Sequence, residues 1–203
     1  MKKLTKLVLT GGPCAGKSTA IAFIRENLIK QGYTAIVMQE TATELYSSGL
    51  SPKKMYSVLN FQQVLFNIQM AKENYFEQAC LNFNDSEHIV LIFDRGLLDG
   101  KVYLGNEKFA ELLKIENITE KEIYDRYDAV FKLVTSANGA KEYYSLKNNA
   151  IRRETPEEAI VLDNKMTEVW KKHPNFNEID NSTCFEQKLE RLLDKILTFL
   201  KNY

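Results

Sequence analysis

The sequence has few cysteines, no net charge and no long apolar run. Its three cysteines, Cys14, Cys80 and Cys184, are odd in number and far apart, which favours neither a disulfide framework nor a zinc site. Lys and Arg number 27, as do Asp and Glu, so no positive excess is present to gather nucleic acid. The longest purely aliphatic or aromatic run, Ile89 to Phe93, is far below the roughly 20 residues of a membrane span. These absences predict a cytoplasmic protein with neither a membrane span nor a nucleic-acid partner.

The composition and the apolar pattern are those of a packed α/β domain. Apolar residues make up 44% of the chain, and Gly and Pro number only 9 and 4, which excludes disordered and fibrous classes. No linker divides the chain. Five apolar runs predict strands over residues 4–10, 35–39, 88–93, 129–134 and 176–179. Because helical segments lie between them, we expect one domain over residues 1–203 with a doubly wound, five-stranded parallel sheet.

Several helical segments have recognisable starts. Thr155, Pro156 and Glu158 combine an N-cap, a proline at the first helical position and a capping-box glutamate. The same capping-box spacing recurs at Thr119 with Glu122 and at Thr183 with Glu186. The longest helix is predicted over about residues 55–82, with an apolar face formed by Phe61, Leu65, Ile68, Tyr75 and Ala79.

The most informative segment matches the phosphate-binding pattern GxxxxGK[ST]. It consists of Gly11, Gly12, Pro13, Cys14, Ala15, Gly16, Lys17, Ser18 and Thr19. The segment follows the predicted strand 4–10 and opens a helix, a setting in which backbone N–H groups and the helix dipole face bound phosphates. We expect Lys17 on the β- and γ-phosphates of ATP or GTP, and Ser18 on Mg²⁺. A glycine-rich turn that only caps a helix is the alternative.

Three charged residues follow the second and third predicted strands. Asp94 ends an apolar strand and is the expected second protein ligand of Mg²⁺. Arg95 comes next and is expected to hold a transferring or acceptor phosphate, the alternative being a structural pair with Asp94 or a helix end. Glu40 is expected to act as general base for an acceptor hydroxyl, or to contact the metal through water. Its alternative is a carboxylate at a helix start.

These motifs resemble a known family. The segments TGGPCAGKST, QETATEL, FDRGLLDGKVY, NNAIRRETPEEA and HPNFNEIDN are similar to the P-loop domain, of AAA type, that is shared by two groups. One comprises the nicotinamide riboside kinase domains of bacterial NAD regulators, and the other, which is the closer match, comprises the TRPL translocation defect proteins. The resemblance covers nearly the whole chain and implies a P-loop fold of the nucleoside and nucleotide kinase type.

Two segments are similar to particular kinases. Asp94 and Arg95, with Tyr103 further on, resemble the thymidylate-kinase pattern DRYxxSxxAY, although its aromatic and serine positions are occupied by Gly96 and Asp99. Gln62 follows Phe61 on the long helix and resembles the glutamine with which deoxynucleoside kinases read the base. The resemblance therefore implies that Gln62 and Arg95 contact the acceptor; for Gln62 a surface position is the alternative.

Kinases of this fold close a lid whose arginines neutralise the transferred phosphoryl group and exclude water. The candidate lid here covers residues 136–154, in which Arg152 and Arg153 are the expected catalytic cations. An ordinary solvated loop is the alternative.

Two functions remain. The preferred one is a Mg²⁺-dependent kinase that transfers the γ-phosphoryl group of ATP or GTP to a nucleoside, a nucleotide or a related small metabolite. The alternative, which the resemblance to the translocation defect proteins implies, is a nucleotide-dependent regulatory binding protein or slow NTPase that recognises a phosphoinositide head group. The kinase is preferred because it explains Glu40, Asp94, Arg95 and the arginine-rich segment at one edge of the sheet.

Overall fold

The computed structural model describes residues 3–84, 88–140 and 155–203. Five parallel strands form one sheet in the order β2-β3-β1-β4-β5. Their bounds are β1 Lys3–Gly11, β2 Thr34–Met38, β3 His88–Asp94, β4 Ala129–Leu133 and β5 Phe176–Ile179. All five predicted strands are confirmed, and so is the α/β fold class.

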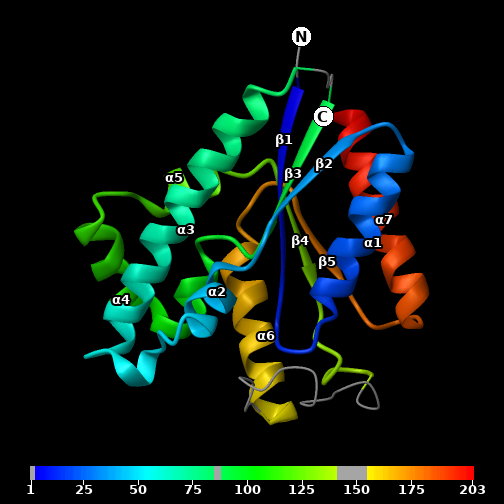
Figure 1. Ribbon diagram of the computed structural model, residues 1–203. Helices are drawn as coiled ribbons and strands as arrows, with labels where there is room; N and C mark the ends of the chain where they lie inside the picture. The colour runs from blue at the N-terminus through cyan, green and yellow to red at the C-terminus, as the bar shows by residue number, and fades with distance from the viewer. Residues whose placement is uncertain (1–2, 85–87, 141–154) are drawn as a thin grey trace.

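Helices cover both faces of the sheet (Figure 1). One face carries α1 (Lys17–Lys30) and α7 (Phe185–Asn202), and the other carries α3 (Val58–Leu81), α4 (Asp99–Ile115) and α6 (Pro156–Trp170). The shorter elements are α2 (Thr41–Ser47), the 3₁₀ turn η1 (Pro52–Lys54) and α5 (Glu120–Tyr124). This is the doubly wound arrangement that the alternation of strands and helices predicts.

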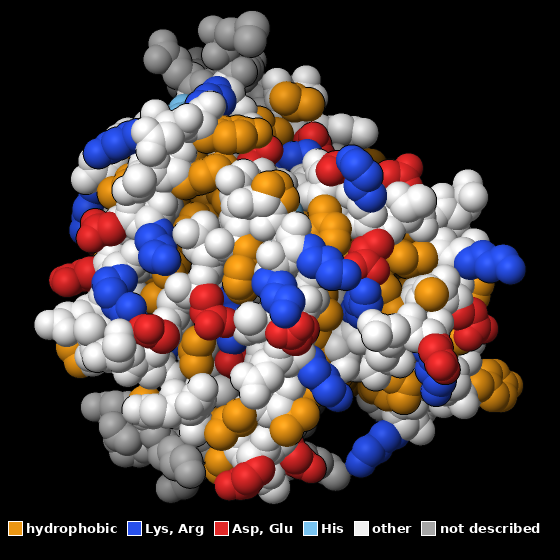
Figure 2. Space-filling view, turned by 180° about the vertical axis from the view of Figure 1, so that it is seen from behind, with side chains coloured by type: hydrophobic (Ala, Val, Ile, Leu, Met, Phe, Trp, Pro, Cys, Tyr) orange, Lys and Arg blue, Asp and Glu red, His pale blue; other side chains and the backbone are white. Residues whose placement is uncertain are grey.

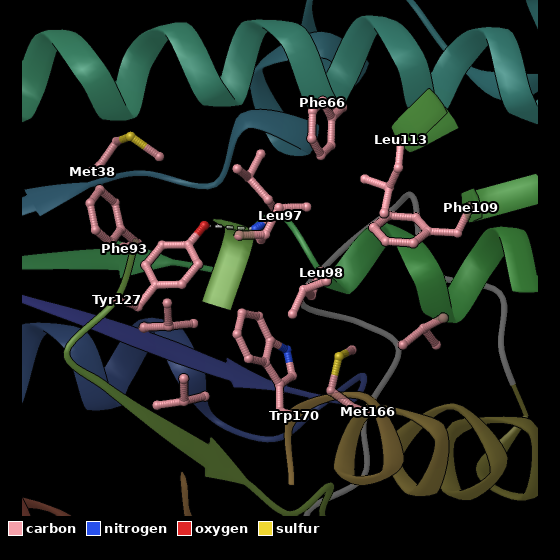
Figure 3. Close-up of a cluster of buried hydrophobic side chains, with 14 of the residues drawn as sticks. Met38, Phe66, Phe93, Leu97, Leu98, Phe109, Leu113, Tyr127, Met166 and Trp170 are labelled. Atoms are coloured by element: carbon pink, nitrogen blue, oxygen red, sulfur yellow. Dashed lines mark hydrogen bonds between the residues drawn. The ribbon is translucent and has the colours of Figure 1, made fainter. Parts of the chain in front are cut away.

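The alternation of side chains along each strand divides the buried residues between two cores. On β1, Val8 packs toward α3 and α6, whereas Leu7 and Leu9 pack toward α1 and α7. Figure 3 shows the first core, where the ring of Tyr127 lies between those of Phe93 and Trp170 of α6. Both faces of the central strands are therefore buried, which explains their continuous apolar sequences.

Two details of the helix predictions are wrong. The capping boxes at Thr119 and Thr155 are present, but the one expected at Thr183 is not, because α7 begins at Phe185 with Cys184 as its N-cap. The predicted apolar face of the long helix is also wrong in part. Ile68 and Tyr75 are exposed, whereas the buried residues of α3 are Phe61, Gln62, Phe66, Gln69, Glu73 and Cys80.

The surface carries charges of both signs. Figure 2 shows Lys and Arg side chains interspersed with Asp and Glu on the rear face, with no extended patch of one sign there. Among the helices of the described ranges, none combines the length and apolar character that a membrane crossing requires.

Candidate active site

The loop between β1 and α1 depends on two glycines. Gly11 has a φ of 152°, and a Cβ on it would lie 2.3 Å from the carbonyl oxygen of Leu133. Gly16 has a φ of 84°, and a Cβ on it would lie 2.5 Å from Cε2 of Phe185. Only glycine adopts such backbone angles without strain. The loop therefore needs glycine at both positions, as the phosphate-binding pattern predicts.

The loop is also fixed by contacts from within and from α6. Nζ of Lys17 donates a hydrogen bond of 3.3 Å to the carbonyl oxygen of Gly11, and its side chain is buried. On the other side, Oδ1 of Asp163 accepts a hydrogen bond of 2.9 Å from the backbone N–H of Gly12. A loop held in place before a ligand arrives loses less conformational entropy on binding.

Ser18 and Asp94 line one open cavity of about 770 Å³. The Oδ1 atom of Asp94 is buried and has no hydrogen-bond partner within the described ranges. Burial raises the pKa of Asp94, although the charge of Lys17 opposes this. A hydroxyl and an unpaired carboxylate oxygen are ligands that fit Mg²⁺, which binds through few protein groups and keeps several waters.

A protein cage for a metal is not found among the residues that the structure describes, since they contain no cluster of three or more His, Cys, Asp or Glu side chains suited to a metal ion. The site therefore fits a metal that shares its coordination with substrate phosphates.

Arg95 connects the ends of three strands. Its Nε donates a hydrogen bond to Oε1 of Glu40, and its Nη1 donates to Oδ2 of Asp99 at 3.2 Å and to the carbonyl oxygen of Gly11 at 3.4 Å. The salt bridges of Arg95 are thus with Glu40 and Asp99 and not with Asp94. Arg95 itself has a φ of 75°, in the left-handed region that residues other than glycine rarely adopt.

Glu40 is the N-cap residue of α2, but its side chain makes no capping hydrogen bond. Instead Oε2 accepts a hydrogen bond of 2.7 Å from Oγ1 of Thr43, and Oε1 faces Arg95. Burial would raise the pKa of Glu40, yet the charges of Arg95 and Lys17 and these hydrogen bonds outweigh burial and lower the pKa from 4.5 to about 2. The side chain is therefore ionised at neutral pH.

A second cavity, of about 430 Å³, brings together Pro13 of the phosphate loop, Glu40, Gln62 and Arg95. It lies between α2, α3 and the start of α4. Its walls are mainly apolar and include Tyr46, Phe61, Leu65, Phe66, Leu97 and Leu112. Mainly apolar pockets with a few converging polar groups are typical binding sites for small molecules. We call this cavity the acceptor pocket.

Gln62 is buried on the wall of the acceptor pocket and is only 6% exposed, so the surface alternative is wrong. No hydrogen-bond partner of its amide group is found within the described ranges. The side chain lies close to the start of α4, since a Cβ added to Gly100 would be 3.1 Å from its Oε1. Buried amides are normally hydrogen-bonded. The amide of Gln62 is therefore available to a ligand in the pocket.

The candidate lid is described only at its start. Residues 136–140 follow β4, and the carbonyl oxygen of Asn138 accepts a hydrogen bond of 2.6 Å from Nδ2 of Asn181. Residues 141–154, which include Arg152 and Arg153, lie outside the described residues, so the predicted role of these arginines stays a prediction.

Sequence reasoning missed the role of Asp99. This side chain is buried, and its Oδ1 accepts a hydrogen bond of 2.7 Å from Nε1 of Trp170, while Oδ2 accepts one of 2.8 Å from Oγ1 of Thr10. The sequence holds no local signal for this contact, because Arg95 lies before α4, which begins at Asp99, and the helical i,i+4 spacing does not apply. Asp99 thus fixes the orientation of Arg95.

Comparisons with known proteins agree with the fold. The AAA domain family matches residues 6–188 of the chain, whereas no curated protein matches it. Among solved structures, deoxyadenosine kinase from M. mycoides with its products dCMP and a flexible dCDP bound is similar, with a TM-score of 0.58 and 20% identity over 96% of this chain and 100% of that chain. At this identity the likeness concerns the fold, which is that of a P-loop kinase. The closer resemblance to the translocation defect proteins is not confirmed by either match.

Proposed function

Because the chain belongs to the AAA domain family and has the fold of a P-loop nucleoside kinase, we propose that it transfers the γ-phosphoryl group of ATP or GTP to a hydroxyl of a small acceptor. The observation that carries the proposal is the acceptor pocket. It joins the phosphate loop to Glu40, Gln62 and Arg95 in one cavity. A slow NTPase would need no such pocket beside its phosphate site.

The proposed chemistry assigns a role to each group. The loop N–H groups and Lys17 hold the β- and γ-phosphates, and Ser18 and Asp94 hold Mg²⁺, which neutralises phosphate charge. Glu40 orients the acceptor hydroxyl and takes its proton as the oxygen bonds to the γ-phosphorus and the bond to the nucleoside diphosphate breaks. Its low pKa makes it a weak base, so we assign it chiefly to orientation.

Arg95 would stabilise the negative charge that develops on the transferred group. The arginines of the proposed lid, Arg152 and Arg153 within residues 136–154, would add to this charge stabilisation and exclude water. We treat residues 1–203 as one catalytic unit.

The charge of the acceptor pocket favours a neutral acceptor. Among the described residues that line it, the charged side chains are Glu40, Asp99 and Arg95, and Arg95 is engaged by both carboxylates. Such a pocket repels an acceptor that already carries phosphate, which argues against nucleotides and phosphoinositide head groups. The apolar walls and the amide of Gln62 suit a flat ring with hydrogen-bonding edges. A nucleoside is therefore the first acceptor to test, in line with the likeness of the fold to deoxyadenosine kinase.

The test is a transfer assay with γ-labelled ATP or GTP, Mg²⁺ and a panel of nucleosides, nucleotides and inositol phosphates. We expect a labelled nucleoside monophosphate and no labelled inositol phosphate. The Lys17→Ala variant is the control, because it keeps the pocket but lacks the cation on the phosphates. Release of phosphate at a rate that no acceptor changes would favour the NTPase instead.

A further inference from the structure

The backbone that carries Arg95 is held by two buried side chains. Its left-handed φ of 75° is strained for a residue with a side chain. The carbonyl oxygen of Arg95 accepts a hydrogen bond of 3.3 Å from Nε2 of Gln69. Two residues later, the N–H of Leu97 donates a hydrogen bond of 3.0 Å to the hydroxyl of Tyr127, drawn as a dashed line in Figure 3. Gln69 and Tyr127 thus fix the backbone of residues 95–97.

Both of these side chains are bound by one carboxylate. Oε1 of Glu73 accepts hydrogen bonds of 3.1 Å from Nε2 of Gln69 and 2.9 Å from the hydroxyl of Tyr127. Oε2 accepts one of 3.0 Å from Nε of Arg126, which balances the charge. Glu73 is 1% exposed and is not among the residues that line the acceptor pocket.

We propose that Glu73 is a positioning residue that acts on the proposed reaction through the backbone of residues 95–97. Gln69 and Tyr127 hold this backbone only while Glu73 holds them. The angle at which the Arg95 side chain leaves the backbone decides whether its Nε reaches Glu40. The inference rests on the proposed function for the role of Arg95, but the hydrogen-bonded network exists independently of that role.

The chemistry of the network explains why the residue is an acid. Three donors, from Gln69, Tyr127 and Arg126, converge on the two oxygens of Glu73. A carboxylate accepts all three, whereas an amide has one oxygen and presents an N–H₂ group to the remaining donors. Because Arg126 is charged, it would take the single oxygen of a glutamine. The side chains of Gln69 and Tyr127 would then be held less firmly against residues 95–97.

Two variants and two matched controls test the proposal. Tyr127→Phe removes only the hydroxyl that binds the N–H of Leu97, and Glu73→Gln removes the carboxylate. Tyr124→Phe removes another tyrosine hydroxyl, one that donates to the carbonyl of Val169. Glu77→Gln neutralises an acid on the same helix that pairs with Lys6. Neither control touches residues 95–97.

The measurements are amide hydrogen exchange over residues 95–97, and steady-state kinetics in the transfer assay. For both test variants we expect faster exchange at Leu97 and a fall in kcat of roughly tenfold, with the nucleotide KM changed by less than about twofold. The controls should match the wild type in both measurements.

Wild-type exchange at Leu97 in both test variants would overturn the proposal, and so would a fall in kcat that the controls share. Faster exchange with unchanged kcat would equally overturn it, because the network would then be structural only. If no variant and no wild-type protein transfers phosphate, the proposed function fails while the exchange data still decide whether Glu73 fixes this backbone.

Discussion

Nε of Arg95 donates a hydrogen bond to Oε1 of Glu40, so the first residue after β3 and the second residue after β2 form one ion pair. The pair lies on the wall of the acceptor pocket, next to Pro13 of the phosphate loop. The guanidinium of Arg95 keeps Glu40 ionised, and the carboxylate of Glu40 in turn fixes the position of the guanidinium. In the proposed reaction the acid and the cation would therefore act as a unit, and we expect their effects on activity not to be additive.

The first prediction concerns stability in acid. Burial would raise the pKa of Glu40, but the charges of Arg95 and Lys17 together with hydrogen bonds lower it from 4.5 to about 2. Between these pH values the unfolded chain binds the proton and the folded one does not, so the free energy of unfolding falls as the pH falls. The shift corresponds to about 3 kcal/mol. The free energy of unfolding, measured by urea denaturation at several pH values between 4.5 and about 2, should show this loss.

The comparison for this experiment is Glu40→Gln, which has no proton to gain at that position. Its unfolding free energy should fall less steeply than that of the wild type over the same pH interval. Parallel curves for the two proteins would show that Glu40 titrates at its ordinary pKa, and that the ion pair with Arg95 does not stabilise the fold.

The second prediction separates stability from function at Asp94. Burial raises the pKa of this carboxyl, so its ionised form costs folding free energy. Asp94→Asn should therefore raise Tm, by about 2–4 °C for a gain of about 1 kcal/mol. The Mg²⁺ concentration needed for half-maximal activity should rise at least about tenfold. Calorimetry and a Mg²⁺ titration of the transfer assay check the two effects.

Asp180→Asn is a suitable control for this pair of measurements. Asp180 is an exposed acid whose pKa is lowered to about 2, first by a hydrogen bond from Ser182 and then by one from Arg191. Its substitution should lower Tm slightly and leave the Mg²⁺ requirement unchanged. A lower Tm together with an unchanged Mg²⁺ requirement in Asp94→Asn would contradict the assignment of Asp94 to the metal.

The sequence predicts the strands and the phosphate loop well because both depend on local properties. Continuous apolar runs are typical of buried parallel strands, and Gly11 and Gly16 are needed for the positive φ angles of the loop. Asp94 is equally accessible to sequence reasoning, since it directly ends an apolar strand. The edge of the sheet at which these residues meet follows from the parallel order of the strands.

The polar residues on the buried face of α3 do not follow from such local properties, and Gln62 is expected at the acceptor through the resemblance to deoxynucleoside kinases. Hydrophobic periodicity places apolar residues on the buried face of a helix, but the buried face of α3 contains Gln62, Gln69 and Glu73. These polar groups are buried because partners or a cavity lie opposite them, and those partners come from distant parts of the chain. Tyr127 is 54 residues away from Glu73. Only the tertiary structure brings them together.

The third prediction compares two glycines with similar backbone angles. Gly16 has a φ of 84° and Gly32 has a φ of 88°, but a Cβ on Gly16 would lie 2.5 Å from Phe185, whereas one on Gly32 would meet nothing within 4 Å. Gly32→Ala should lower the free energy of unfolding by about 1–2 kcal/mol, the cost of the left-handed angle alone. Gly16→Ala should lower it further and also weaken nucleotide binding. Equal losses of stability, with nucleotide affinity unchanged, would exclude a steric role of Phe185.

The last prediction concerns selection of the acceptor. Gln62 presents its amide to the acceptor pocket, while its neighbour Gln63 donates a hydrogen bond of 2.8 Å to Glu116 and does not line the pocket. Gln62→Ala should therefore raise the acceptor KM roughly tenfold, the effect of one or two lost hydrogen bonds, and leave the nucleotide KM unchanged. Gln63→Ala should change neither constant. Glu40→Gln should instead lower kcat by roughly a hundredfold, because the group that orients the hydroxyl is lost. Steady-state kinetics with each substrate varied in turn distinguish these effects. If Gln62→Ala raises both KM values to a similar extent, the acceptor binds elsewhere. A ligand in this cavity would contact the amide of Gln62, which lines its wall.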